Sequence, residues 1–143
     1  MPCDNCVITS NFKRRWGRLH KGIDLDIDTT NATSAFIRAV QKGVVTFKRT
    51  KGYGLLAKVR HSKRRETLYG HLALQVAKDS TVVKKGDIIG IMGSTGSSTG
   101  KHLHFEHRVN GKALNPMKSL VFEFSSALLK NIATTTLFCK SNQ

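Results

Sequence analysis

The chain has 143 residues, and its 24 Lys and Arg against 9 Asp and Glu give a formal net charge of +15. This length and a hydrophobic content of 39% fit one globular domain with its own core, and they exclude disordered, collagen-like and proline-rich proteins. No apolar stretch approaches the roughly 18 residues that a membrane span requires. The charge predicts an anionic partner: nucleic acid, anionic lipid or an acidic cell-wall polymer.

The N-terminal residues are polar from the start and are followed by a basic cluster. A secretory signal would instead place an apolar stretch of about 7–15 residues here, so we expect no signal peptide. Cys3 and Cys6 form a CxxC, but no second pair at zinc-finger spacing follows and Cys139 stands alone. We therefore interpret the cysteines as reduced thiols rather than as ligands of a structural zinc ion.

Short β-rich runs separated by glycine predict a mainly antiparallel β fold with little helix. Residues 33–42 are interpreted as a short irregular or helical piece. Asn110-Gly111 is a strong hairpin signal. We interpret residues 118–143 as a C-terminal appendage that packs on the domain and ends in a frayed segment. The predicted strands are Gly22–Ile27, Gly43–Lys48, Gly54–His61, Thr67–Leu72, Asp87–Met92 and Leu103–Val109.

Three segments in or next to these strands carry histidines that alternate with apolar residues. If His20–Asp24 is extended, His20 and Asp24 share one face, and Ile23 and Leu25 point to the other. The same alternation places His102, His104 and Glu106 together, opposite Leu103, Phe105 and Val109. It also groups Thr67, Tyr69 and His71. The sequence therefore predicts that side chains able to bind a metal collect on one side of the sheet.

Two histidines and an aspartate are typical zinc ligands, and three protein ligands plus a water form a catalytic rather than a structural site. A further imidazole nearby can take a proton or stabilise developing charge. Asp26 is interpreted as solvated rather than as a support for a ligand. Tyr69 is left open, as a residue that either faces the groove or caps a strand.

With these histidines and Asp24, the chain resembles the lysostaphin/LytM-type zinc endopeptidases that cut peptidoglycan peptides. The resemblance covers residues 8–117 and rests on an ordered set of motifs, with Lys101 where the family often has proline. After the motifs come Asn110-Gly111 and Asn115-Pro116. The motifs are His20–Asp24 (HKGID), Gly52–Leu55 (GYGL), Thr67–Leu72 (TLYGHL), Val83–Gly90 (VKKGDIIG) and Gly93–Glu106 (GSTGSSTGKHLHFE).

The resemblance implies a compact antiparallel sheet with a groove walled by loops, and a catalytic domain over residues 1–117. It implies one zinc ion per chain, bound by His20, Asp24 and His104. His71 and His102 would flank the zinc-bound water and the scissile carbonyl, one as general base and the other as stabiliser of the oxyanion. Which histidine takes which role stays open.

The implied substrate is a bacterial peptidoglycan peptide, with either glycine bridges or D-Ala–diamino-acid cross-links cut, by a monomer acting at the cell wall. The expected context is a phage lysin, a virion component or part of a larger exported protein. A non-catalytic LytM-like module that binds the wall or activates a partner enzyme is the alternative. Specific nucleic-acid binding is not expected, because the basic stretch over residues 42–65 holds only two aromatic residues, Phe47 and Tyr53, and no known motif.

Positive charge is concentrated in residues 42–65, which hold no acid before Glu66. These residues form either a solvated hairpin tip or a surface that attracts an anionic polymer. On the second interpretation, the charge concentrates the protein on wall polymers such as teichoic acids. The cluster consists of Lys42, Lys48, Arg49, Lys51, Lys58, Arg60, Lys63, Arg64 and Arg65.

Overall fold

The computed structural model describes residues 1–15, 17–27 and 35–119. These residues form a mainly antiparallel β fold, as predicted, with one short helical turn at 116–119. The expected appendage over residues 118–143 falls almost entirely outside the described residues. The strands are β1 (Cys6–Ser10), β2 (Arg14–Arg15), β3 (Arg18–Leu19), β4 (Ile23–Ile27), β5 (Phe36–Arg38), β6 (Gly43–Thr50), β7 (Gly54–Arg60), β8 (Arg65–Gln75), β9 (Thr81–Val83), β10 (Ile88–Met92), β11 (Leu103–Val109) and β12 (Lys112–Leu114).

The main sheet runs in the order β1-β4-β11-β8-β7-β6-β9, with β12 paired to β11. The hairpins β6–β7, β7–β8 and β11–β12 join consecutive strands, whereas β4, β11 and β8 are neighbours that lie far apart in the chain. Asn110 and Gly111 both have positive φ, at 50° and 75°, and Val109 pairs with Lys112. The Asn-Gly hairpin is therefore confirmed as a two-residue turn with the geometry that such a hairpin prefers.

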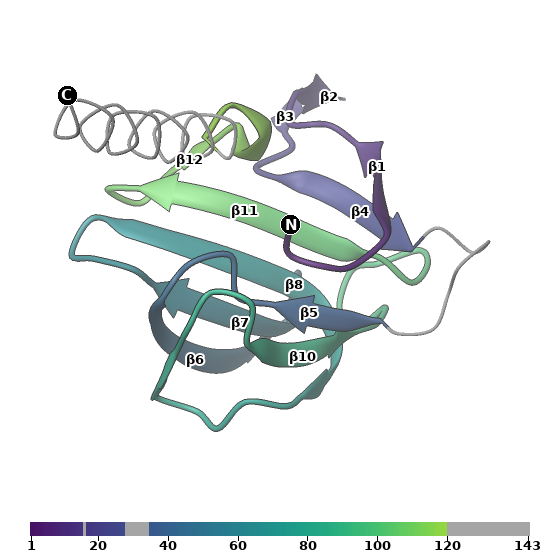
Figure 1. The fold of residues 1–143 in the computed structure, drawn as a ribbon. Helices are drawn as coiled ribbons and strands as arrows, with labels where there is room; N and C mark the ends of the chain where they lie inside the picture. The colour runs from purple at the N-terminus through teal and green to yellow at the C-terminus, as the bar shows by residue number, and fades with distance from the viewer. Residues whose placement is uncertain (16, 28–34, 120–143) are drawn as a thin grey trace, which may run out of the picture.

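One face of the sheet forms the core and is crossed by β5 and β10 (Figure 1). Alternating residues of the long strands point into this core, and they include Ile23, Leu25, Val59, Leu103 and Phe105. Burying each of these side chains stabilises the fold by about 1.5–3 kcal/mol. The opposite face remains available for polar side chains, and the site lies there.

All six predicted strands are present, but the prediction for residues 33–42 was wrong in its described part. Phe36–Arg38 is strand β5, which pairs with β10. The strand is three residues long, too short to show alternation, and its partner lies some fifty positions away. The strands β1, β2, β3, β9 and β12 were also missed, and all of them except β1 are only two or three residues long.

The interpretation of Cys3 and Cys6 as reduced thiols is also corrected, because the structure joins them in a disulfide. Cys3 is buried, and its backbone forms an isolated antiparallel β-bridge with Ile37 of β5. The disulfide thus closes the N-terminal turn against the core. Within the described part of the chain, no helix is long and apolar enough to cross a membrane.

Candidate metal centre

Asp24 and His104 face each other across two neighbouring strands. Asp24 lies in β4 and His104 in β11, and they are direct antiparallel partners. Residues paired in this way project to the same face, with Cβ atoms about 5 Å apart. Ile23, Leu25 and Phe105, their neighbours along the strands, are fully buried on the other face. The predicted alternation therefore holds in both strands.

His20 reaches this pair from the loop before β4. We expected His20 and Asp24 to share a strand face, but β4 begins at Ile23, so His20 lies outside it. The loop passes tightly over β11 at Gly22, where a Cβ atom would collide with the carbonyl oxygen of Phe105. The expected proximity is correct, but a loop that requires glycine produces it, not strand alternation.

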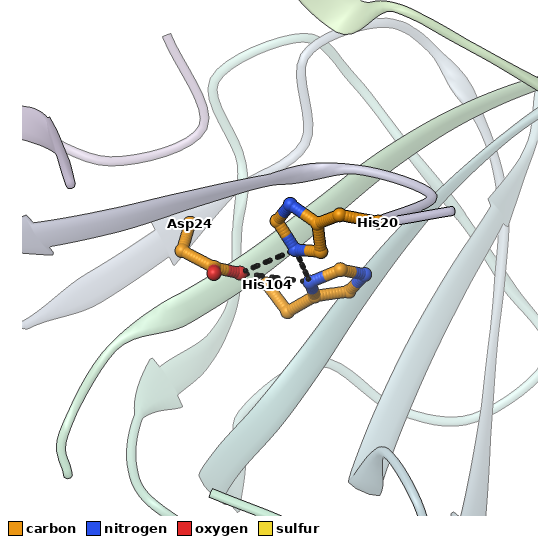
Figure 2. A group of neighbouring side chains, drawn as sticks. All are labelled: His20, Asp24 and His104. Carbon is orange, nitrogen blue, oxygen red and sulfur yellow. Dashed lines mark hydrogen bonds and ion pairs between the residues drawn. The ribbon is translucent and has the colours of Figure 1, made fainter. Parts of the chain in front are cut away.

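Three atoms of these residues converge on one point (Figure 2). Nε2 of His20 lies 3.1 Å from Oδ1 of Asp24 and 3.1 Å from Nδ1 of His104. Nδ1 of His104 lies 2.8 Å from the same carboxylate oxygen. The side chains are 7%, 13% and 10% exposed for His20, Asp24 and His104. The cluster is therefore mostly shielded from solvent but open on one side.

The outer nitrogen of each histidine has an oxygen acceptor. Nδ1 of His20 lies 2.9 Å from the carbonyl oxygen of Asn11, and Nε2 of His104 lies 3.1 Å from Oε1 of Glu106. A carbonyl or carboxylate oxygen only accepts, so each outer nitrogen carries the hydrogen. In the neutral rings the inner nitrogens therefore present lone pairs to the centre, which is the form in which histidine binds a metal.

This donor set fits a zinc ion. With bonds of about 2.0–2.2 Å in a tetrahedron, two zinc ligands lie about 3.3 Å apart. The separations of 2.8–3.1 Å need only a small opening to match that distance. Two lone pairs at 3.1 Å repel unless a proton or a cation lies between them. One divalent cation would satisfy both nitrogens and the carboxylate, and three ligands leave a position for water.

His71 enters the same side of the sheet through a bulge in β8. Its φ of 64° lies in the left-handed region. Leu55 pairs with Leu72 and Ala57 pairs with Tyr69, so two residues of β8 stand opposite one residue of β7. Such an extra residue re-aims the side chains that follow it. His71 therefore points to the site, whereas regular alternation would place it with Tyr69.

The prediction that Thr67, Tyr69 and His71 share one face is therefore wrong, because the bulge turns His71 away from the face of the other two. Tyr69 is fully buried, and its ring lies 5.3 Å from that of Phe105 in the core. Its hydroxyl is hydrogen-bonded to Thr67 and accepts the backbone N–H of Val40. Burial raises the pKa of Tyr69 to about 12. Neither open interpretation of Tyr69 was right, because it is a core residue.

His71 and His102 lie side by side next to the three ligand atoms. Their ring centroids are 4.7 Å apart, and the ring of His71 lies 6.0 Å from that of His104. Nε2 of His102 lies 3.9 Å from Oδ1 of Asp24. Both histidines therefore reach the edge of the cluster without joining it.

Backbone carbonyls orient these two rings. Nδ1 of His71 lies 2.8 Å from the carbonyl oxygen of Thr95, and Nδ1 of His102 lies 2.9 Å from that of Gly100. Nδ1 is then the protonated nitrogen in each neutral ring, and Nε2 keeps the lone pair. Each histidine can thus accept a proton at Nε2, or donate one there when it is charged.

The five predicted site residues line one groove of about 630 Å³. The turn between β6 and β7 forms one wall, and the loop over residues 93–100 forms another. Residues 19–21, before β4, form a third wall. The groove is lined by Leu19, His20, Lys21, Asp24, Gly52, Tyr53, His71, Ser97, Ser98, Thr99, His102 and His104.

The charges in the groove shift the pKa values of its groups. Burial raises the pKa of Asp24, but the hydrogen bond with His104 and the charges of the nearby histidines outweigh it and lower that pKa to about 2. Burial lowers the pKa of His71, and its neighbours His102 and His104 lower it further, against an opposing contribution from the Thr95 carbonyl. At neutral pH Asp24 is ionised and His71 is neutral.

Comparison with known proteins gives the family. Residues 18–116 match the sequence model of peptidase family M23. The chain belongs to peptidase family M23. It is 45% identical over 101 residues to the DD-carboxypeptidase/endopeptidase Mpg of Neisseria meningitidis, which covers 70% of this chain and 22% of that protein. The M23 domain described here thus spans less than a quarter of the length of that relative.

Solved structures of M23 proteins share the fold. The catalytic domain of lysostaphin from Staphylococcus simulans is 28% identical with a TM-score of 0.65, over 80% of this chain and 89% of that one. A zinc-containing peptidase from Vibrio cholerae is 30% identical with a TM-score of 0.67, over 76% of this chain and 35% of that one. The expected lysostaphin-like fold is therefore confirmed.

The M23 site also contains a buried carboxylate that sequence reasoning left without a role. Glu106 is fully buried, and its Oε1 accepts hydrogen bonds from His104 Nε2 at 3.1 Å and from the Tyr53 hydroxyl at 2.7 Å. Its Oε2 accepts one from Nε of Arg108 at 2.7 Å. Burial raises the pKa of Glu106, but these partners lower it more. Glu106 is therefore an ionised group that holds His104 from behind.

The sequence indicates some of these supporting residues but not others. The two-residue spacing from His104 placed Glu106 on the correct face, so its contact could have been predicted. Tyr53 lies in the GYGL motif, but nothing in the sequence indicates that its hydroxyl reaches Glu106. Asn11 and Thr95 act through backbone carbonyls, for which no side chain gives a signal.

Proposed function

We propose that this M23 domain is a zinc-dependent endopeptidase that hydrolyses peptide bonds of bacterial peptidoglycan, and that it acts at the cell wall. The observation that carries the proposal is the convergence of His20 Nε2, Asp24 Oδ1 and His104 Nδ1, with both ring tautomers set by outer acceptors. A zinc ion bound there supplies a coordinated water with a pKa near 7 and polarises the carbonyl of the substrate.

The chain's own residues would move the protons. His71 is neutral, and its Nε2 faces the groove with a lone pair, so it suits the role of general base. His102 is more exposed, with 20% of its side chain accessible, and a protonated Nε2 there can donate to a developing oxyanion. The Thr95 and Gly100 carbonyls keep both rings in these orientations.

The similarity to Mpg, a DD-carboxypeptidase/endopeptidase, favours a DD bond in directly cross-linked stem peptides over a glycine bridge. The test is mass spectrometry of the fragments that the zinc-loaded protein releases from directly cross-linked and from glycine-bridged peptidoglycan. We expect cleaved cross-links from the first wall alone. Fragments cut within the glycine bridges would overturn this assignment of the bond.

The alternative is a non-catalytic module that activates a partner enzyme. Such a module has no need for a complete ligand set, whereas this chain keeps His20, Asp24 and His104 in place. Metal analysis after reconstitution separates the two functions. One zinc ion per chain supports the enzyme, and protein that retains no zinc would favour the activator.

A further inference from the structure

A second cleft lies on the same face of the sheet as the metal centre. Its volume is about 370 Å³, and Tyr53 lines both this cleft and the main groove. The Tyr53 ring lies 5.7 Å from that of His104, so the cleft begins within one side chain of the ligand cluster. A substrate seated at the metal centre can therefore extend past Tyr53 into it.

The cleft combines an apolar floor with a basic rim. Leu56 and Leu68 are buried beneath it, at 8% and 4% exposure. The charged lining residues are three cations and one acid: Lys48, Lys58, Arg108 and Glu66. An aliphatic arm would cover the leucines, and an anionic group at its end would reach the cations.

The charges of the rim are incompletely balanced. Arg108 is neutralised by Glu106 at 2.6 Å between Nη2 and Oε2, and Lys58 Nζ lies 3.6 Å from Oε2 of Glu66. Lys48 has no acidic partner among the described residues within ion-pair distance. One positive charge thus remains in the cleft.

Sheet register brings this charge next to Lys58. Lys48 pairs with Leu56, and Thr46 pairs with Lys58, so the two lysines are diagonal neighbours on one face. Such neighbours lie about 7–8 Å apart and repel each other when both are charged. An anion held between them relieves the repulsion, and a carboxylate has the size and charge to do so.

We propose that the second cleft binds a carboxylate of the substrate, carried on an aliphatic arm next to the scissile bond. The proposal rests on the proposed function and defines its specificity. Lys48 and Lys58 are the residues that would distinguish a peptide with a free carboxylate from its amidated form.

The test compares two peptides that differ only in a carboxylate or a carboxamide at the residue beside the scissile bond. Zinc-loaded wild-type protein should have a KM about five- to tenfold lower for the carboxylate peptide, with similar kcat values. Lys48→Ala and Lys58→Ala should remove that preference and leave kcat unchanged. Lys112→Ala is the matched control, because Lys112 is exposed on β12 outside the cleft, and it should keep the preference.

Equal KM values for the two peptides in the wild type, or an undiminished preference in Lys48→Ala, would overturn the proposal. If the wild type cleaves neither peptide, the proposed function fails separately. Equilibrium binding of the two peptides to the same proteins then decides the cleft: a carboxylate preference that Lys48→Ala abolishes supports it, and equal binding refutes it.

Discussion

Glu106 lies behind the metal centre and contacts His104 without belonging to the three ligand residues. It fixes the Nε2–H tautomer of His104, and its second oxygen is held by Arg108. Acceptors of this kind orient a metal-binding imidazole and raise its basicity, and their loss typically weakens metal binding 10- to 100-fold.

Glu106→Gln should therefore weaken zinc binding by about tenfold or more. The glutamine keeps the size of the side chain but removes the charge that His104 faces. Zinc affinity is measured by competition with a chelator, together with thermal unfolding of both proteins. Glu66→Gln is the control, because Glu66 lies on the same face but pairs with Lys58 instead of with a ligand. Wild-type zinc affinity in Glu106→Gln would remove the positioning role.

At the scale of elements, the loop over residues 93–100 follows β10, and two of its backbone carbonyls contact His71 and His102. The Thr95 hydroxyl donates to the Leu72 carbonyl at 2.8 Å and accepts the Leu55 N–H at 2.9 Å, while the Thr95 carbonyl holds His71. Gly54 has a φ of 64°, and a Cβ there would collide with the backbone of Thr95. This close packing requires that residue 54 has no side chain.

Gly54→Ala should destabilise the protein by about 1–3 kcal/mol, through left-handed strain and displacement of Thr95. It should also lower kcat by about tenfold or more, because His71 loses its orientation. Urea unfolding and peptide hydrolysis measure the two effects. Gly52→Ala is the control for stability, because no heavy atom lies within 4 Å of its Cβ position and it should unfold as the wild type does. Unchanged stability and kcat in Gly54→Ala would contradict this account of the loop.

The elements also explain what the sequence could predict. The strands β4 and β11 show clear alternation of apolar and polar residues, so Asp24, His104 and Glu106 were placed on the correct face. The β8 bulge adds one residue at Gly70-His71, and no local pattern distinguishes it from a regular strand. His20 was predicted to lie beside Asp24, and it does, but through the loop at Gly22 and not through strand alternation. Pairing of β5 with β10 and the Cys3–Cys6 disulfide depend on tertiary contacts that a one-dimensional pattern does not contain.

The net charge of +15 belongs to the scale of the whole molecule. Arg60, Lys63 and Arg64 are exposed where β7 turns into β8. We propose that this hairpin end attracts anionic wall polymers and concentrates the enzyme on its substrate. Lys58 does not belong to this exposed cluster, because it lines the second cleft and pairs with Glu66.

Replacing Arg60, Lys63 and Arg64 together by serine should weaken binding to intact cell walls at low salt. The difference from the wild type should shrink as ionic strength rises, because exposed charges are screened beyond about 10 Å at 0.1 M salt. Cleavage of a small soluble peptide should be unaffected. Sedimentation with purified walls and peptide hydrolysis provide the two measurements. Equal loss of both would show that the hairpin supports the fold or the site.

The most direct test of the proposed function is the release of new amino groups from purified peptidoglycan by the zinc-loaded protein. The account predicts release that stops on treatment with a chelator, returns when zinc is added, and is absent in a folded His104→Ala variant. Zinc-loaded, folded wild-type protein that releases no amino groups from directly cross-linked or glycine-bridged walls would contradict it.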